Sequence, residues 1–237
     1  APFYLRRVKE ALVTFPDPET GQVKAIFTKR NVRTMEFQID FEEAEFYDEL
    51  TEYVEEQSVR AAGDNSPAGR AVGFTMAMLQ RRFASSVYAV RRTLERMAEK
   101  RKKILQNPEG YRREQIARQL PEDFDELPED EQDEILADLE GTVASVDPNE
   151  LRADIAKLQK LITRAVSLEQ REVESKLKRL KEALTEQGVF GDPKMKLLLF
   201  TEHKDTLDFL AGDGKEGRPL GKLREWGLSV TQIHGGM

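Results

Sequence analysis

The chain has 237 residues, of which 34% are charged and only 8% are aromatic, and its formal net charge is −7. This composition favours long solvated helices over one thick core, and the negative total argues against a uniformly basic nucleic-acid binder. Cysteine is absent, which excludes disulfides and thiolate metal sites. The absence of cysteine also fits a reducing cytosol, and no apolar run approaches the length of a membrane span, so we predict a cytoplasmic protein without a membrane partner.

Two short elements are predicted in the first forty residues. A helix over residues 2–13 comes first, and an extended segment over residues 23–40 follows, in which apolar and polar side chains partly alternate. Pro16 and Pro18 mark the turn between these elements, because proline fixes its own backbone and cannot continue a helix.

A further helix is predicted over residues 42–61. Asp40 is a candidate N-cap for this helix, and the glutamates of its first turn suit the positive end of the helix dipole. The stretch 63–67 contains glycine, asparagine and proline, which are typical of turns, and it therefore ends the helix.

Two long helices are predicted over residues 69–106 and 149–187, because apolar side chains recur at helical spacing along both. Asp147 and Pro148 form a start signal for the second helix. Two apolar stripes joined by a connector favour antiparallel packing, in which each helix buries the apolar face of the other. A helical hairpin without any further role is the simplest interpretation of this pair.

The connector contains an acidic linker, residues 122–140, with many Asp and Glu residues and neither Lys nor Arg. Such a block repels itself and usually forms a solvated surface linker. Ile135, Leu136 and Leu139 have helical spacing, so a short docked helix is an alternative. A third interpretation is an acidic mimic that competes with nucleic acid for nearby basic residues.

The last part of the chain is predicted to form a β-α-β unit. Residues 196–200 are a short apolar run after the breaker Gly-Asp-Pro at 191–193, which suits a buried parallel strand. An apolar-periodic segment over residues 206–210 and a second strand over residues 228–233 complete the unit. Since the faces and edges of such strands need cover, we interpret the unit as truncated. The expected fold is therefore mainly α, with long antiparallel helices and a truncated β-α-β unit.

Three parts of the chain carry a family resemblance. Residues 2–10 read PFYLRRVKE, residues 46–54 read FYDELTEYV, and residues 196–210 and 233–237 read KLLLFTEHKDTLDFL and IHGGM. In this order they resemble the exit from the first motor lobe, the helix that follows it, and the opening of the second RecA-like lobe in superfamily-two helicases. The closest branch is the Swi/Snf type, including its bacterial relatives that associate with RNA polymerase.

The resemblance implies three regions and a parent activity. Residues 1–40 would leave the first lobe, residues 41–190 would form a long-helix spacer or protrusion, and residues 191–237 would begin the second RecA-like lobe. The parent would be an ATP-dependent helicase or translocase that hydrolyses ATP with Mg. Its partners would be nucleic acid, with duplex DNA favoured, and the missing motor lobes.

The chain departs from the family in the motifs that bind nucleotide. It contains no G-x-x-x-x-G-K-[ST] phosphate loop and no Asp-Glu box inside a strand, both of which the family places in its first lobe. The stretch 211–222 is longer than the usual helix continuation, and four glycines and a proline prevent it from being helical. We therefore predict no catalytic residue, cofactor or metal site in this chain, and no ATPase activity of its own.

Basic side chains between residues 79 and 104 are the first candidates for nucleic-acid binding, because phosphate contacts need cations on one surface. Those that fall on roughly one side of the predicted helix are Arg81, Arg92, Arg96 and Lys103. Arg82 and Arg101 fall elsewhere. A solvated face that pairs with the acidic linker is the alternative interpretation.

The resemblance implies further nucleic-acid contacts. In this family the loops after the second-lobe strands face the nucleic-acid track, and glycine there lets backbone N–H groups approach phosphates. The matching residues in this chain are Thr201, Glu202, His234, Gly235 and Gly236. At the exit from the first lobe they are Arg6, Arg7 and Lys9.

The alternative function belongs to a different class. A stand-alone helical scaffold would recruit a protein partner through its long hairpin, without catalysis. In either case the apolar strands predicted over residues 196–200 and 228–233 have an open edge. Open apolar edges favour pairing with another copy, so we also predict a homo-oligomer that forms through the truncated unit.

Overall fold

The computed structural model divides the chain into two units, Ala1–Glu36 and Phe37–Met237. The residues that it describes, with the backbone alone at 67 and 68, are 19–21, 32–62, 67–108, 110, 131, 135, 139, 143, 147–171, 174–215 and 218–234. In the first unit residues 19 and 20 form a turn, and residues 32–36 form no regular element.

Two predicted elements concern the start of the chain. The helix predicted over residues 2–13 lies outside the described residues, as does most of the predicted extended segment up to residue 31. Its described part, residues 32–40, forms no strand, and its apolar side chains, such as Val32 and Ile39, are exposed.

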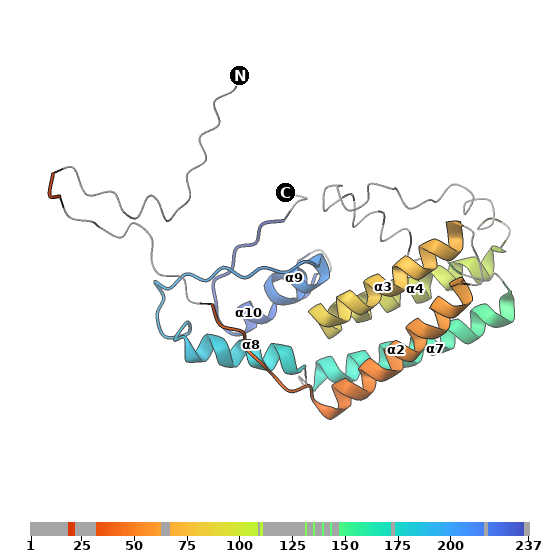
Figure 1. Cartoon of the computed structure of the whole chain (residues 1–237), viewed down its shortest axis with the longest axis horizontal. Helices are drawn as coiled ribbons and strands as arrows, with labels where there is room; N and C mark the ends of the chain where they lie inside the picture. The colour runs from red at the N-terminus through yellow and green to blue at the C-terminus, as the bar shows by residue number, and fades with distance from the viewer. Residues whose placement is uncertain are drawn as a thin grey trace, which may run out of the picture. The chain divides into compact units, whose positions relative to one another are not determined.

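The second unit is built from helices (Figure 1). They are α2 (Phe41–Ala62), α3 (Pro67–Ser85), α4 (Val87–Gln106), α7 (Pro148–Gln170), α8 (Ser175–Glu186), α9 (Lys204–Ala211) and α10 (Lys222–Glu225). The described residues contain no strand, and only an isolated antiparallel bridge joins Asp213 to Leu220. The predicted mainly helical fold is confirmed. None of the described helices is long and apolar enough to cross a membrane.

Two predicted helix starts are confirmed by their capping hydrogen bonds. The Asp40 carboxylate accepts the Glu42 N–H at 3.0 Å, directly before α2. The Asp147 carboxylate accepts two N–H groups of the first turn of α7, at 2.8 and 3.1 Å, and Pro148 follows it. These side chains satisfy backbone donors that have no partner inside a helix, which is why both helices begin there.

The prediction of one long helix over residues 69–106 is wrong, because the chain turns at Ser86. Ser86 has extended backbone angles (φ −161°, ψ 151°), and its hydroxyl accepts the Ala89 N–H at 3.1 Å as the N-cap of α4. Arg82 also donates to the hydroxyl of Thr93, which a straight helix would place about 16 Å further along its axis. The hydroxyl competes with the backbone for hydrogen bonds, so the serine starts a new helix although the apolar periodicity continues.

The prediction of one helix over residues 149–187 is wrong in the same way. α7 ends at Gln170 and α8 begins at Ser175. The Ser175 N–H donates to the Glu43 carboxylate of α2 at 2.9 Å, and the Ser175 hydroxyl accepts the Asp40 N–H at 2.8 Å. Contacts with the start of α2 therefore replace helical hydrogen bonds at this break.

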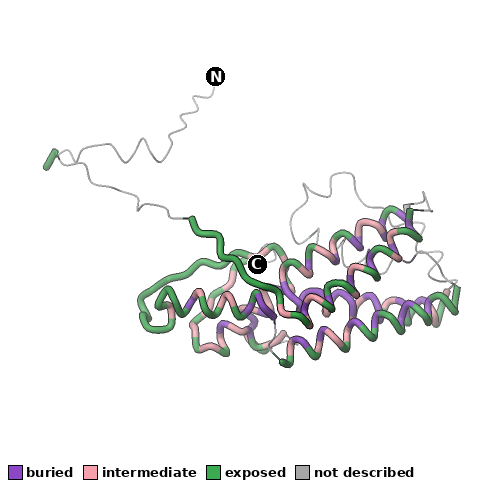
Figure 2. Tube along the Cα trace, turned by 60° about the horizontal axis from the view of Figure 1, so that its bottom comes forward, coloured by how far each residue is buried: buried purple, intermediate pink, exposed green. Residues whose placement is uncertain are grey.

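The core lies among α2, α3, α4 and α7, where α4 packs mainly on α7 and α2 on α3. Figure 2 shows buried positions recurring along these helices. The fully buried apolar side chains of this core include Phe46, Leu50, Met76, Leu79, Leu94, Met97 and Leu158. α4 and α7 run antiparallel, because Arg91 pairs with Glu169 and Arg101 with Asp154. The predicted antiparallel packing of two apolar stripes therefore holds for this pair of shorter helices.

The predicted strands of the β-α-β unit are not strands in the structure. Residues 195–200 and 228–234 form no ladder, and the side chains of Leu198 and Phe200 are 82% and 91% exposed. Strands need neighbouring strands for their backbone hydrogen bonds and cover for their apolar faces, and the described residues offer neither. Only the helical part of the unit is present, as α9.

Backbone hydrogen bonds join the two ends of the stretch between α9 and α10. The Gly221 N–H donates to the Gly212 carbonyl at 2.9 Å, and the Gly214 N–H donates to the Pro219 carbonyl at 3.1 Å. A Cβ atom at Gly221 would meet the Gly212 nitrogen at 2.5 Å, so only glycine allows this approach. Three of the glycines that were expected to prevent a helix, Gly212, Gly214 and Gly221, therefore hold the two ends of this stretch together.

Candidate nucleic-acid interface

The turn between α3 and α4 meets the start of α9 through a hydroxyl cluster, which consists of Ser85, Ser86, Thr201 and Thr206. The Thr206 hydroxyl lies 2.8 Å from that of Ser85 and 2.9 Å from that of Ser86. The Thr201 hydroxyl lies 3.5 Å from that of Ser85. Ser86 and Thr206 are buried, so these hydrogen bonds fix the first turn of α9 on the turn between α3 and α4.

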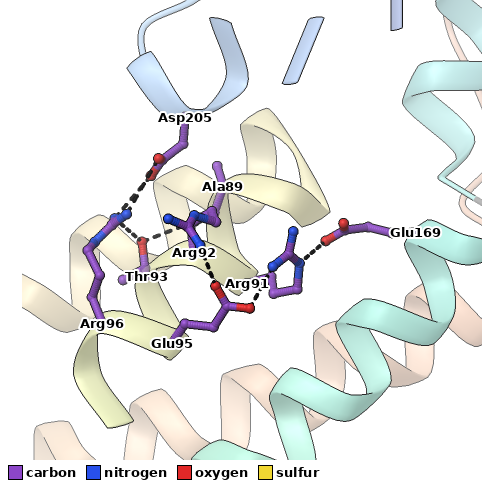
Figure 3. Close-up of polar contacts among 8 residues, drawn as sticks. All are labelled: Ala89, Arg91, Arg92, Thr93, Glu95, Arg96, Glu169 and Asp205. Carbon is purple, nitrogen blue, oxygen red and sulfur yellow. Dashed lines mark hydrogen bonds and ion pairs between the residues drawn. The ribbon is translucent and has the colours of Figure 1, made fainter. Parts of the chain in front are cut away.

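Two arginines reach the same segment of the chain. Arg96 of α4 donates to both oxygens of Asp205, at 3.0 and 3.4 Å (Figure 3). Arg81 of α3 lies 3.9 Å from Glu202, with both side chains exposed. Asp205 belongs to the first turn of α9, where a carboxylate also suits the helix dipole. The structure thus brings together four of the predicted site residues: Arg81, Arg96, Thr201 and Glu202.

The neighbouring arginines of α4 form a second network (Figure 3). Arg91 donates to Glu95 at 2.5 Å and to Glu169 of α7 at 2.6 Å, and Arg92 donates to Glu95 at 2.8 Å. The guanidinium of Arg91 also lies 4.9 Å from the centre of the Tyr88 ring. This network joins α4 to α7, whereas the contacts of Arg96 join α4 to α9.

Burial and hydrogen bonding have opposite effects on the pKa values of Glu169 and Arg91 in the second network. Burial raises the pKa of Glu169 above its ordinary value, although Arg91 acts in the opposite direction. Burial also disfavours the charge of Arg91, but hydrogen bonds to Glu169 and Glu95 outweigh it and raise the pKa of Arg91. Arg91 is therefore a charged structural group that is engaged on two sides.

The other predicted site residues that the structure describes are Arg92, Lys103 and His234. Arg92 pairs with Glu95 of its own helix, and Lys103 is exposed in the last turn of α4. His234 acts electrostatically on Asp208 of α9, whose pKa is raised chiefly by burial. The predicted contacts that lie outside the described residues are Arg6, Arg7, Lys9, Gly235 and Gly236.

Two further basic residues were set apart by the sequence, and the structure buries both. Arg82 and Arg101 are 6% and 1% exposed. Arg101 pairs with Asp154, which also accepts a hydrogen bond from Gln57 at 3.2 Å. These arginines hold helices together inside the bundle and present no cation to a ligand.

The acidic linker is described only at Glu131, Ile135 and Leu139, of which Leu139 is buried. Its pairing with the basic helix, one of the predicted alternatives, therefore lies outside the described residues. The acidic partners of the arginines described above come from α4, α7 and α9, and from the segment just before α9.

Sequence reasoning missed Ser85, Ser86, Asp205 and Thr206. The signal for the first pair was present, since two consecutive serines inside an apolar-periodic stretch are typical of a helix boundary. Asp205 carries the signal of an acidic residue in a first helical turn, but nothing local to it indicates Arg96 as its partner.

Comparisons with protein-family models, with curated proteins and with solved structures found no match to this chain. Among the described residues, no group of three or more His, Asp or Glu side chains is placed to hold a metal ion. The geometry of the contact between α9 and the turn of α3 and α4 is therefore the main basis for a functional proposal.

Proposed function

We propose that this chain belongs to an ATP-driven translocase of the superfamily-two, Swi/Snf-like type, in which it links the two motor lobes and contacts nucleic acid. One observation carries this proposal. Arg81 and Arg96 were selected as cations on one helical face, and Thr201 and Glu202 by family resemblance. These two independent selections meet at one place, the start of α9.

The chemistry of this place suits a phosphate backbone. Arginine offers a planar fork of N–H donors that matches phosphate oxygens, and the partly exposed hydroxyls of Ser85 and Thr201 lie at the same contact. Arg96 is only partly buried, with its side chain 30% exposed. Phosphate contacts give affinity and orientation without reading the base sequence.

The finer fold that we propose explains the exposed apolar segments. In the translocase, residues 196–200 and 228–233 become parallel strands of the second RecA-like lobe, paired with further strands and covered by helices. ATP and Mg bind to groups of the motor lobes that these residues do not include. The α3–α4 turn would then connect the helical spacer directly to the start of the second lobe.

Binding to a short mixed-sequence DNA duplex, measured by fluorescence anisotropy over a series of salt concentrations, tests the proposal. Arg96→Ala should weaken binding and flatten the slope of log K against log salt by about 0.9 for the lost phosphate contact. The matched control is Arg152→Ala, since Arg152 is exposed on α7 and bonded to Asn149. Equal affinities and slopes for wild type and Arg96→Ala would contradict the proposal.

A second candidate function is a helical scaffold for a protein partner. The observation that favours it is that Arg81, Arg92 and Arg96 all pair with carboxylates of this chain. In a scaffold these pairs would be purely structural. The same binding experiment separates the two functions, because a scaffold has no salt-dependent affinity for the duplex.

A further inference from the structure

The two arginines that face the start of α9 are already engaged by carboxylates. Asp205 accepts two hydrogen bonds from Arg96, and the two side chains are 23% and 30% exposed. Glu202 lies beside Arg81 in a looser and more exposed pair. Both acids come from residues 202–205, a segment far in sequence from α3 and α4.

Asp205 occupies two N–H donors of Arg96 that a phosphate would use, whereas Glu202, 3.9 Å from Arg81, opposes phosphate binding through its charge alone. A carboxylate that stays beside the guanidinium also repels a phosphate, so the intact pair weakens phosphate binding. Because ion pairs near the surface are weak, a phosphate can replace them at a modest cost in affinity. The acidic side chains therefore set the affinity of the site as directly as the basic ones.

We propose that Asp205 and Glu202 are intramolecular competitors for nucleic-acid phosphates. In the absence of nucleic acid their carboxylates neutralise the guanidiniums of Arg96 and Arg81. When phosphates bind, the carboxylates separate from these guanidiniums. The inference rests on the proposed function, and it deepens it by naming how the site is regulated.

The competition has a mechanical consequence for α9. In the unbound state its first turn is held by the ion pair of Asp205 as well as by the hydroxyl cluster. After the exchange, the hydroxyl cluster and the stacking of Phe209 on Tyr88, with ring centres 5.2 Å apart, remain. Nucleic-acid binding thus loosens one attachment between the helical spacer and the segment that begins the proposed second lobe.

A double-mutant cycle on the full chain, with the same labelled DNA duplex, tests the competition. Asp205→Asn should tighten binding about two- to fivefold, the range expected when a weak competing ion pair is removed. The gain should vanish in an Arg96→Ala background, since the competition concerns that guanidinium alone. Glu55→Gln is the control, because Glu55 is exposed on α2 and its change alters the net charge by the same amount.

A second pair protects the test against a folding defect of Asp205→Asn. Glu202→Gln changes an exposed residue before α9, and its gain should vanish in an Arg81→Ala background. Circular dichroism of each variant shows whether the helices are retained. If Asp205→Asn has lost helix, the affinities of Glu202→Gln with and without Arg81→Ala decide whether the carboxylates compete with phosphate.

Each outcome has a distinct meaning. Gains in binding that Glu55→Gln reproduces, or that persist without the arginines, overturn the competition and leave the proposed function intact. An affinity that is unchanged in Asp205→Asn and Glu202→Gln also overturns the competition and leaves the proposed function intact. Arginine variants that bind as wild type overturn the proposed function and the competition together.

Discussion

Glu174, directly before α8, and Glu43 of α2 share one buried joint between helices. The Glu43 carboxylate accepts the Ser175 N–H at 2.9 Å, and the Glu174 carboxylate interacts with the backbone N–H of Val87 at the start of α4. Glu174 is 5% exposed, and one of its oxygens has no hydrogen-bond partner among the described residues. Burial, and then the neighbouring charge of Glu43, raise the pKa of Glu174 to about 8.

The first prediction is a loss of stability as pH rises from about 4.5 to about 8. The folded pKa of Glu174 exceeds its ordinary value of 4.5, so folding favours the protonated acid. Its contribution to stability is fully present below about pH 4.5 and is lost as pH rises towards about 8. Among the other groups that act on it, Glu169 raises this pKa further and Lys176 lowers it.

Glu174→Gln checks this prediction, because the amide stays neutral and its oxygen still accepts the Val87 N–H. Urea unfolding should show the variant more stable than wild type by at least about 1 kcal/mol at pH 9, and nearly equal at pH 5. Glu182→Gln, on the exposed face of α8, should follow the wild type at both pH values. A Glu174→Gln penalty that is independent of pH would sink the idea.

The second prediction concerns the buried ion pair of Arg101 and Asp154. Asp154→Ala should cost about 3–5 kcal/mol of unfolding free energy, because it leaves the guanidinium, 1% exposed, without its carboxylate. Replacing both residues, with Arg101→Met and Asp154→Leu, should restore most of that loss, since no buried charge remains. Denaturant unfolding measures both, and a single variant that costs less than about 1 kcal/mol would show that water reaches the pair.

The third prediction concerns the cap at Ser86. Ser86→Ala removes the acceptor of the Ala89 N–H and the hydrogen bond to Thr206, so it should destabilise the chain by about 1–2 kcal/mol. Thr163→Ala is a suitable comparison, because it removes an exposed hydroxyl from α7 that bonds only within its own helix. It should change stability by less than about 0.5 kcal/mol. Equal effects of the two changes would mean that Ser86 is not a cap in solution.

The fourth prediction is self-association through the exposed apolar segment 195–200. Leu198 and Phe200 are its most exposed side chains, and the backbone around them has no strand partner among the described residues. Light scattering should show association that rises with concentration and is suppressed by Leu198→Lys with Phe200→Lys. Val59→Lys, at an exposed apolar position of α2, controls for added charge. A wild type that stays monomeric throughout would contradict the prediction.

The fifth prediction is that this chain alone neither binds nor hydrolyses ATP measurably. Its sequence contains no phosphate loop, and phosphoryl transfer depends on groups that hold the phosphates and the metal in place. Isothermal calorimetry with Mg-ATP should give no binding heat at micromolar chain concentrations. A micromolar dissociation constant would refute the assignment of the nucleotide site to other parts of the parent.

The sequence predicts helices well here and their ends unevenly. The range of α2 and the start of α7 follow from local signals, namely capping acids and the proline after Asp147. The break at Ser86 has a local signal in its two consecutive serines and its cap to Ala89, although the apolar periodicity runs through it. The break before Ser175 has none, because the Ser175 N–H donates to Glu43, a distant residue that no local pattern encodes.

The sequence selected residues of the candidate site but not their pairing. Arg81 and Arg96 were selected from the spacing of one continuous helix, although they lie on α3 and α4, and Thr201 and Glu202 were selected from the family resemblance. That Asp205 would neutralise Arg96 depends on how α9 lies on α4, which is decided by the stacking of Phe209 on Tyr88 and by Leu177. The strands failed for a related reason, since strand formation depends on partners that a local pattern cannot supply.

The two ion pairs between α4 and α7 fix the register of these helices. Sliding α4 by one turn, about 5.4 Å, would move the buried guanidinium of Arg101 away from Asp154. Since stranded buried charges are costly, α4 and α7 must travel as one rigid lever rather than ratchet past each other.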